Sequence, residues 1–161
     1  MISLKVIREE VMKKLLVLAL IFSTQAAFAW TNSDFRIANK NIELSISDDA
    51  TDGCWTNLGE VRRYAGDKFS NAGANVMQKL IGLAHPDNNN YWFTINVLGY
   101  RLNSGVCIGS ITTELVSGSR LSGDFHFAYV HLSNLLVSSS SGSNLNNQVL
   151  SMVGNSIREL N

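Results

Sequence analysis

The chain has 161 residues, and its 13 Lys and Arg balance its 13 Asp and Glu, so the formal net charge is zero. Charges of one sign never gather into a long run. This excludes an electrostatic reason to bind nucleic acid or an anionic membrane, because both require clustered cations.

The amino terminus has the pattern of a secretory signal peptide over residues 1–29. A charged Met-Lys-Lys at 12–14 precedes an unbroken apolar run at 15–22, and small residues stand at Ala27 and Ala29 where the peptidase cleaves. Translation from Met12 is an alternative start, because the charged residues before it make a poor leader. The apolar run is far below the roughly 20 residues that span a bilayer, so we expect no integral membrane segment after signal removal.

The remaining residues, 30–161, are predicted to form a single exported α+β domain that is periplasmic or secreted. The only cysteines, Cys54 and Cys107, lie in this part. In an exported chain an even count favours pairing, and the chain-entropy model gives such a bridge about 4 kcal/mol of stability. A reactive thiol or half of a metal site is the alternative, but no Cys-x-x-Cys spacing supports it.

The first half of the domain reads as strand, helix, strand. Strict alternation over Ile42–Ser47 predicts a half-buried strand, and apolar residues at three- and four-residue steps over Leu58–Ala72 predict an amphipathic helix. Asn57 and Glu60 are spaced as a capping box for that helix. The short apolar stretch Val76–Ile81 is predicted to return as a strand beside the first.

The second half reads as three long strands followed by a helix. The strands are predicted over Tyr91–Leu102, Val106–Val116 and Asp124–Val137, and a period near 3.6 predicts a helix over Leu145–Leu160. The predicted fold is one antiparallel sheet of about four to five strands, in the order strand, helix, four strands, helix. Both helices would pack on one face of the sheet, which buries both apolar stripes.

Residues with catalytic or metal-binding chemistry are few. Asp48, Asp49 and Asp52 crowd one turn, but the further oxygen ligands of a calcium loop do not follow at the right spacing. Their simpler role is to favour the turn and to complement the positive end of the helix dipole. We therefore predict no metal site and no cofactor.

The histidines give a weak case for catalysis. His126 and His131 are five residues apart in a predicted strand, an offset that sends their side chains to opposite faces, so they would not share a metal. His85 lies in a loop beside Asp87, where a solvated turn histidine is the commoner outcome. No nucleophile motif occurs, and we assign no catalytic residue.

The aromatic residues give a stronger indication of function than the histidines do. The long strands carry more aromatic side chains than so small a core can hold if alternation persists, and some should stay on the open face of the sheet. Trp92, Tyr100 and Tyr129 are the candidates for such a binding surface, although they could instead fill the layer beneath the helices.

Three function classes follow. The favoured one is a non-enzymatic protein-binding module whose partner is another envelope protein, such as an accessory factor of envelope assembly or secretion. A periplasmic inhibitor or immunity protein is equally natural for a small chain with one disulfide. A small hydrolase that uses His85 or His126 is the third, and the oligomeric state is open.

Overall fold

The computed structural model describes residues 30–31, 35–77, 89–121 and 124–161. The predicted signal peptide, the end of the predicted strand at Val76–Ile81, and His85 lie outside these ranges. The structure therefore does not test those predictions.

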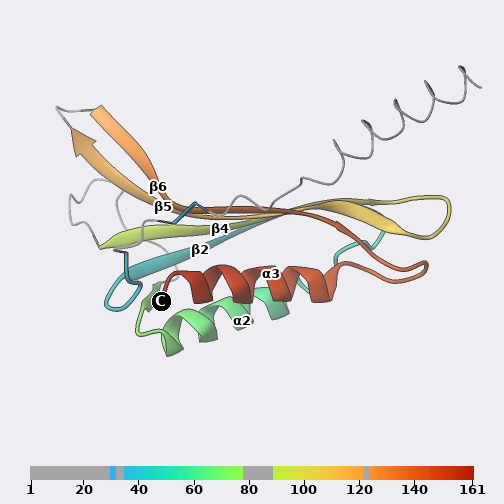
Figure 1. Cartoon of the computed structure of the whole chain (residues 1–161), viewed down its shortest axis with the longest axis horizontal. Helices are drawn as coiled ribbons and strands as arrows, with labels where there is room; N and C mark the ends of the chain where they lie inside the picture. The colour runs from blue at the N-terminus through green and yellow to red at the C-terminus, as the bar shows by residue number, and fades with distance from the viewer. Residues whose placement is uncertain (1–29, 32–34, 78–88, 122–123) are drawn as a thin grey trace, which may run out of the picture.

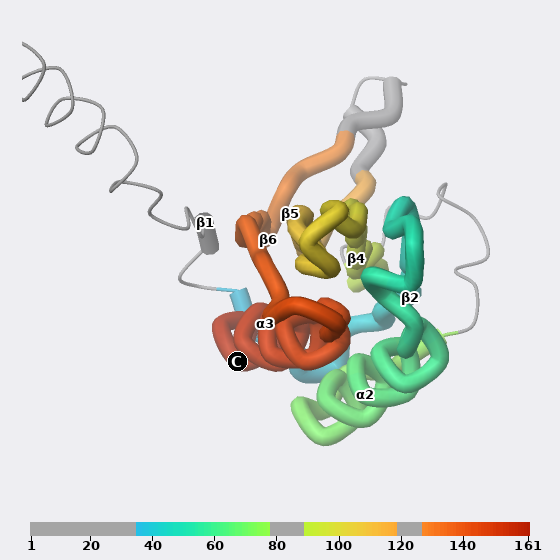
Figure 2. The backbone as a smooth tube through the Cα atoms, turned by 90° about the vertical axis from the view of Figure 1, so that its right-hand side faces the viewer, coloured from blue at the N-terminus to red at the C-terminus, as the bar shows by residue number. Residues whose placement is uncertain are grey.

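The domain is α+β: one sheet with two helices on one of its faces (Figure 1). The sheet has six strands in the order β1-β6-β5-β4-β2-β3, and the end-on view in Figure 2 shows both helices on the same side of it. The predicted fold class is confirmed. The elements are β1 Trp30–Thr31, β2 Asn41–Ala50, α2 Leu58–Asn71, β3 Asn75–Met77, β4 Asn90–Arg101, β5 Cys107–Leu121, β6 Asp124–Ser138 and α3 Asn146–Glu159.

The sheet is mixed rather than purely antiparallel, which corrects the sequence-based prediction. β4, β5 and β6 form the predicted antiparallel meander, but β2 runs parallel to both β3 and β4. The reason is that α2 follows β2 and carries the chain back across the sheet, so β3 starts at the end where β2 started. A helix that returns the chain in this way gives parallel neighbours.

The helix α2 begins where the sequence predicted, but its first turn is built differently. Asn57 makes no side-chain hydrogen bond to the helix backbone. Its side-chain carbonyl accepts from the indole nitrogen of Trp55 at 2.7 Å, and its amide donates to the Glu60 carboxylate at 2.8 Å. Because Trp55 occupies the oxygen that would cap the helix, the expected capping box does not form.

The core lies between the sheet and the two helices. Phe69 of α2 packs edge to face on Phe93 of β4, with ring centroids 4.9 Å apart, and both side chains are fully buried. At one end of the same layer, burial raises the pKa of Tyr91. The helices supply the opposite wall with two apolar stripes: Val61, Ala65 and Phe69 from α2, and Val149, Met152, Val153 and Ile157 from α3.

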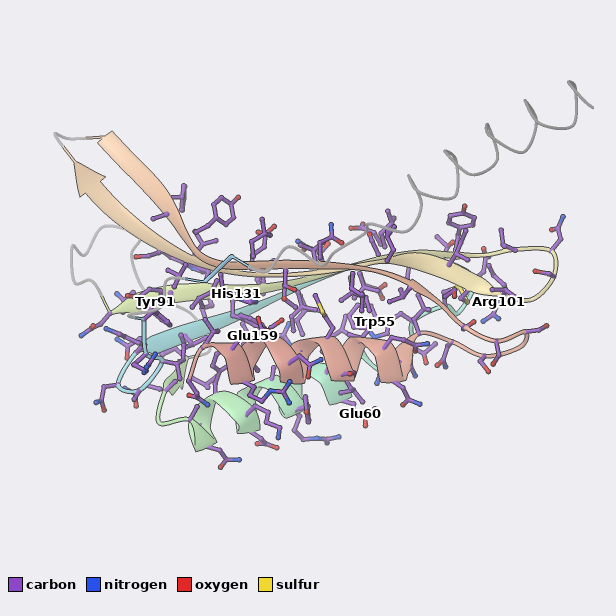
Figure 3. All side chains as sticks on the ribbon, in the orientation of Figure 1. Trp55, Glu60, Tyr91, Arg101, His131 and Glu159 are labelled. Carbon is purple, nitrogen blue, oxygen red and sulfur yellow. A yellow bond between two sulfur atoms is a disulfide. The ribbon has the colours of Figure 1, made fainter. Side chains whose placement is uncertain are left out.

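The disulfide closes the other end of this layer. Cys54 and Cys107 are joined, with Cα atoms 5.5 Å apart, and they lie buried with Leu145 just before α3. Arg101, labelled in Figure 3, gathers the surrounding loops by donating to the carbonyl oxygens of Asp52, Gly105, Ser143 and Gly53 at 2.8–3.3 Å. The predicted disulfide thus ties the start of α2 to the start of β5.

Candidate binding surface

The face of the sheet that carries no helix is the candidate functional surface. Along β4, Tyr91, Phe93, Ile95 and Val97 are buried, and the residues between them point the other way. The ladders to β5 and β6 extend this alternation across three strands. They give five open-face rows: Tyr100–Ile108–Ser138, Leu98–Ser110–Leu136, Asn96–Thr112–Asn134, Thr94–Glu114–Leu132 and Trp92–Val116–Tyr129.

Two of these rows form an apolar hollow at the disulfide end of the sheet, which we call the open-face hollow. It has a volume of about 330 Å³ and is lined by Leu98, Tyr100, Ile108, Gly109, Ser110, Leu136 and Val137. Leu98, Tyr100 and Leu136 are 56%, 51% and 61% exposed. Leu98 and Tyr100 on β4 face Leu136 on β6 across β5, and three large apolar side chains this exposed around one hollow are more than the scattered surface hydrophobics of an ordinary domain.

A second apolar cluster occupies the opposite end of the same face. The ring centroids of Trp92 and Phe127 are 6.3 Å apart in a T-shaped pair, and Tyr129 stands opposite Val116 in the row of Trp92. Tyr129 is 52% exposed. Between the two clusters lies the row Asn96–Thr112–Asn134, which is wholly polar, so the face is apolar at its ends and polar in its middle.

Trp92, Tyr100 and Tyr129, the three residues singled out from the sequence, all lie on this face. The structure brings Trp92 and Tyr129 into one row and places Tyr100 at the far end of β4. Sequence reasoning missed Leu98, Ile108 and Leu136. Leu98 falls in the same alternation as Trp92 and Tyr100, so the sequence pattern also predicts that it faces outward, but the prediction was limited to aromatic side chains.

His131 is buried against α3 and is not a site of catalysis. Its side chain is fully buried, and neither ring nitrogen has a hydrogen-bond partner among the residues that the structure describes. Nδ1 lies 3.9 Å from a carboxylate oxygen of Glu159 (Figure 3). Burial lowers the pKa of His131, and the nearby Glu159 carboxylate partly opposes that effect. A neutral imidazole sealed from solvent has no access to a substrate.

Among the side chains that the structure describes, the remaining candidates for metal or acid–base chemistry do not converge. The backbone of His126 pairs with Ser119, while its side chain is outside the described part of the structure. Asp48 accepts from the backbone nitrogen of Ala50, and Asp49 accepts from the Ser47 hydroxyl, each at 3.1 Å. Within the described ranges no three His, Cys, Asp or Glu side chains cluster as a metal site would require.

A polar groove between the two helices is larger than the open-face hollow but is a weaker candidate for a binding site. Its volume is about 480 Å³, and it is lined by residues near the carboxyl ends of α2 and α3. Its cations are already engaged: Lys68 lies 5.4 Å from the ring centroid of Tyr64, and Arg158 donates to Asn155 at 3.1 Å. We therefore place the candidate surface on the sheet.

Comparison with known proteins gives a fold and no family. No protein-family model matches the chain, and no curated protein matches it. Solved structures that are similar in fold include a dodecamer of PelC from Paraburkholderia phytofirmans and a dodecamer of a point variant of PelC from the same organism. The first has a TM-score of 0.55 and 17% identity, and the second 0.54 and 16%. Each similarity covers 84% of this chain, with 96% of the first structure's chain and 97% of the second's.

Proposed function

We propose that the protein is an exported, non-enzymatic protein-binding module that uses the helix-free face of its sheet. The observation that carries this proposal is the cluster of Leu98, Tyr100 and Leu136, each more than half exposed, around the open-face hollow. An exposed cluster of large apolar side chains marks a protein interaction site, and Tyr is one of the residue types enriched in such interfaces. The partner we expect is another envelope protein.

Two features support the cellular setting of this proposal, the Cys54–Cys107 disulfide and the leader pattern at residues 1–29. The Cys54–Cys107 disulfide is compatible with an oxidising periplasmic or extracellular location. Among the described residues, no helix has the length and apolarity needed to cross a membrane.

Self-association is also part of the proposal. The two similar structures are both dodecamers, which supports an assembly of several copies of this chain as the working form. An assembly would present the open face many times and would raise the avidity of binding without new contacts.

Site-specific photo-crosslinking tests the proposed surface. A photoreactive phenylalanine replaces Tyr100, and the purified mature protein is irradiated in envelope extract. The matched control carries the same group at Arg63, which is exposed on α2. We expect one defined cross-linked protein from position 100 and none from position 63.

Two other outcomes would replace the proposal. Equal labelling at both positions, or none at either, would show that the open face binds no protein. A captured enzyme whose activity falls on binding would favour the inhibitor or immunity class over an assembly factor.

A further inference from the structure

Glu114 is the only charged residue in the five open-face rows. It lies on β5, between Thr94 of β4 and Leu132 of β6, and its chain neighbours Thr113 and Leu115 are buried on the covered face. Its side chain is half-buried and makes no hydrogen bond or ion pair with the residues that the structure describes. The open face therefore carries one negative charge that no described residue neutralises.

Glu114 lies between the two apolar ends of the face, so a partner seated on one end comes close to it. Successive residues of a strand are about 3.3 Å apart, which puts Glu114 roughly 13 Å along the sheet from the row of Leu98 and roughly 7 Å from the row of Trp92. A protein interface of ordinary size covers about 800 Å² of each partner, or roughly 28 Å in each direction. A protein that binds the open-face hollow over such an area covers Glu114 as well.

The burial of Glu114 in an interface sets a condition on the partner. A carboxylate loses its hydrogen bonds to water when a protein surface covers it, and this loss is unfavourable unless a cation or hydrogen-bond donors replace the water. Its neighbours in the rows on either side, Thr112 and Val116 on its own strand, supply no cation. The cation must therefore come from the partner. Arg is well suited, because its guanidinium group can bind a carboxylate through two parallel hydrogen bonds and Arg is enriched in interfaces.

We propose that the open face binds a different protein that presents an Arg or Lys side chain to Glu114 and an apolar side chain to the open-face hollow. The inference rests on the proposed function, because it names the chemistry of the partner expected on that surface. The charge pair selects the partner: a protein with the same apolar side chain but no cation opposite Glu114 would leave a buried charge unpaired.

The same charge argues against a second copy of this chain as the occupant in a face-to-face contact. None of the residues in the five rows is Lys, Arg or His. Two open faces in contact would bury two carboxylates and no cation, and such a pairing of like charges is unfavourable. An assembly of copies therefore leaves this face to the other protein.

Charge reversal at Glu114 tests the pairing. Each variant carries the photoreactive phenylalanine at position 100, and the concentration that gives half-maximal cross-linking is measured in the same envelope extract. Glu114→Gln keeps the shape of the side chain without its charge and should raise that concentration roughly tenfold or more, and Glu114→Lys should abolish cross-linking. The control, Asp67→Lys, makes the same change in net charge on the exposed side of α2 and should have no effect. Circular dichroism confirms that each variant is folded.

A charge swap then tests the partner's side of the pair. A photoreactive phenylalanine at Thr94, in the row of Glu114, identifies the partner peptide that lies there, and this peptide should contain an Arg or Lys. Its replacement by Glu should abolish capture by the unmodified chain and restore capture by Glu114→Lys.

Three results would overturn the inference and leave the proposed function standing: capture by both Glu114 variants at the concentration of the unmodified chain, a mapped peptide without Arg or Lys, or a charge swap that restores nothing. Capture of a second copy of this chain from position 100 would also overturn it. If the unmodified chain gives no cross-link from position 100, the proposed function and the inference both fail.

Discussion

The two faces of the sheet differ in what their side chains accomplish. On the helix-covered face of β4, four consecutive inward residues are buried in one continuous core, and the disulfide closes its end. On the open face the same strand alternates between apolar clusters at its ends and Thr94 and Asn96 in its middle. Folding requires only one buried face, so it does not explain the apolar residues of the open face. The binding of a partner is the explanation that we propose for them.

The largest effect should come from the disulfide that fastens the covered face. Replacing Cys54 and Cys107 together by Ala frees a loop of sequence separation 53. The chain-entropy model gives a loss of about 4 kcal/mol in the free energy of unfolding. Urea denaturation measures it, with the disulfide-bonded chain as reference. A double variant as stable as that reference would show that the packing around Leu145 holds this end without the covalent bond.

A slightly smaller loss should follow when the covered face loses one ring. Phe93→Ala removes the side chain that packs on Phe69 and should cost about 3 to 4 kcal/mol, because the cavity does not refill. Leu98→Ala is its matched control on the open face of the same strand and should cost less than about 1 kcal/mol. Denaturation midpoints of the two variants decide the comparison. Equal losses in the free energy of unfolding would contradict the claim that the covered face stabilises the fold and the open face does not.

The close approach of the β4 and β5 backbones at Gly109 gives a third effect on stability, of intermediate size. A Cβ added at Gly109 would overlap the carbonyl oxygen of Leu98 on the neighbouring strand, so Gly109→Ala should cost about 2 kcal/mol. At Gly59, in the first turn of α2, a Cβ meets nothing within 4 Å, and Gly59→Ala should stabilise by about 0.5 kcal/mol. Thermal unfolding of the two variants should therefore move in opposite directions. A neutral Gly109→Ala would mean that β4 and β5 can separate locally.

The smallest expected effect on stability depends on pH through His131. Because burial lowers the pKa of His131 in the folded state, the unfolded chain binds the proton first as the pH falls through about 6.5. The free energy of unfolding should then decrease below pH 6.5 and level off once the pH passes below the folded-state pKa. His131→Gln should flatten this part of the profile. A profile with the same slope in both proteins would assign the dependence to other groups.

The sequence predicted most of the elements, because their signals are local, although β5, predicted to end at Val116, continues to Leu121. The alternation on β4 and the apolar stripes on α2 and α3 identify these elements within a residue or two, and export with two cysteines was enough to pair Cys54 and Cys107. Parallel pairing of β2 and β3 could not be predicted in the same way. It depends on where the chain returns after α2, which no local pattern encodes.

The candidate surface was predicted in part for a similar reason. Alternation identified Trp92 and Tyr100 as outward-facing, but it does not say which face the helices cover. The ladder between β5 and β6 also shifts register between Leu115 and Val116. Because of this shift, the face of the sheet that His131 occupies does not predict the face of His126 by residue counting along β6. The burial of His131 had no sequence signal, because it depends on α3 lying beneath β6.

The most direct test of the account combines two measurements on Leu98→Ala. The first is its free energy of unfolding, measured at a dilution where sedimentation shows a monomer. The second is the yield of cross-linked partner from a photoreactive group at position 100. We predict that stability stays within about 1 kcal/mol of the unmodified chain, while the cross-linked yield falls strongly. A variant that loses as much stability as Phe93→Ala but keeps its full cross-linked yield would show that the open face serves folding and not binding.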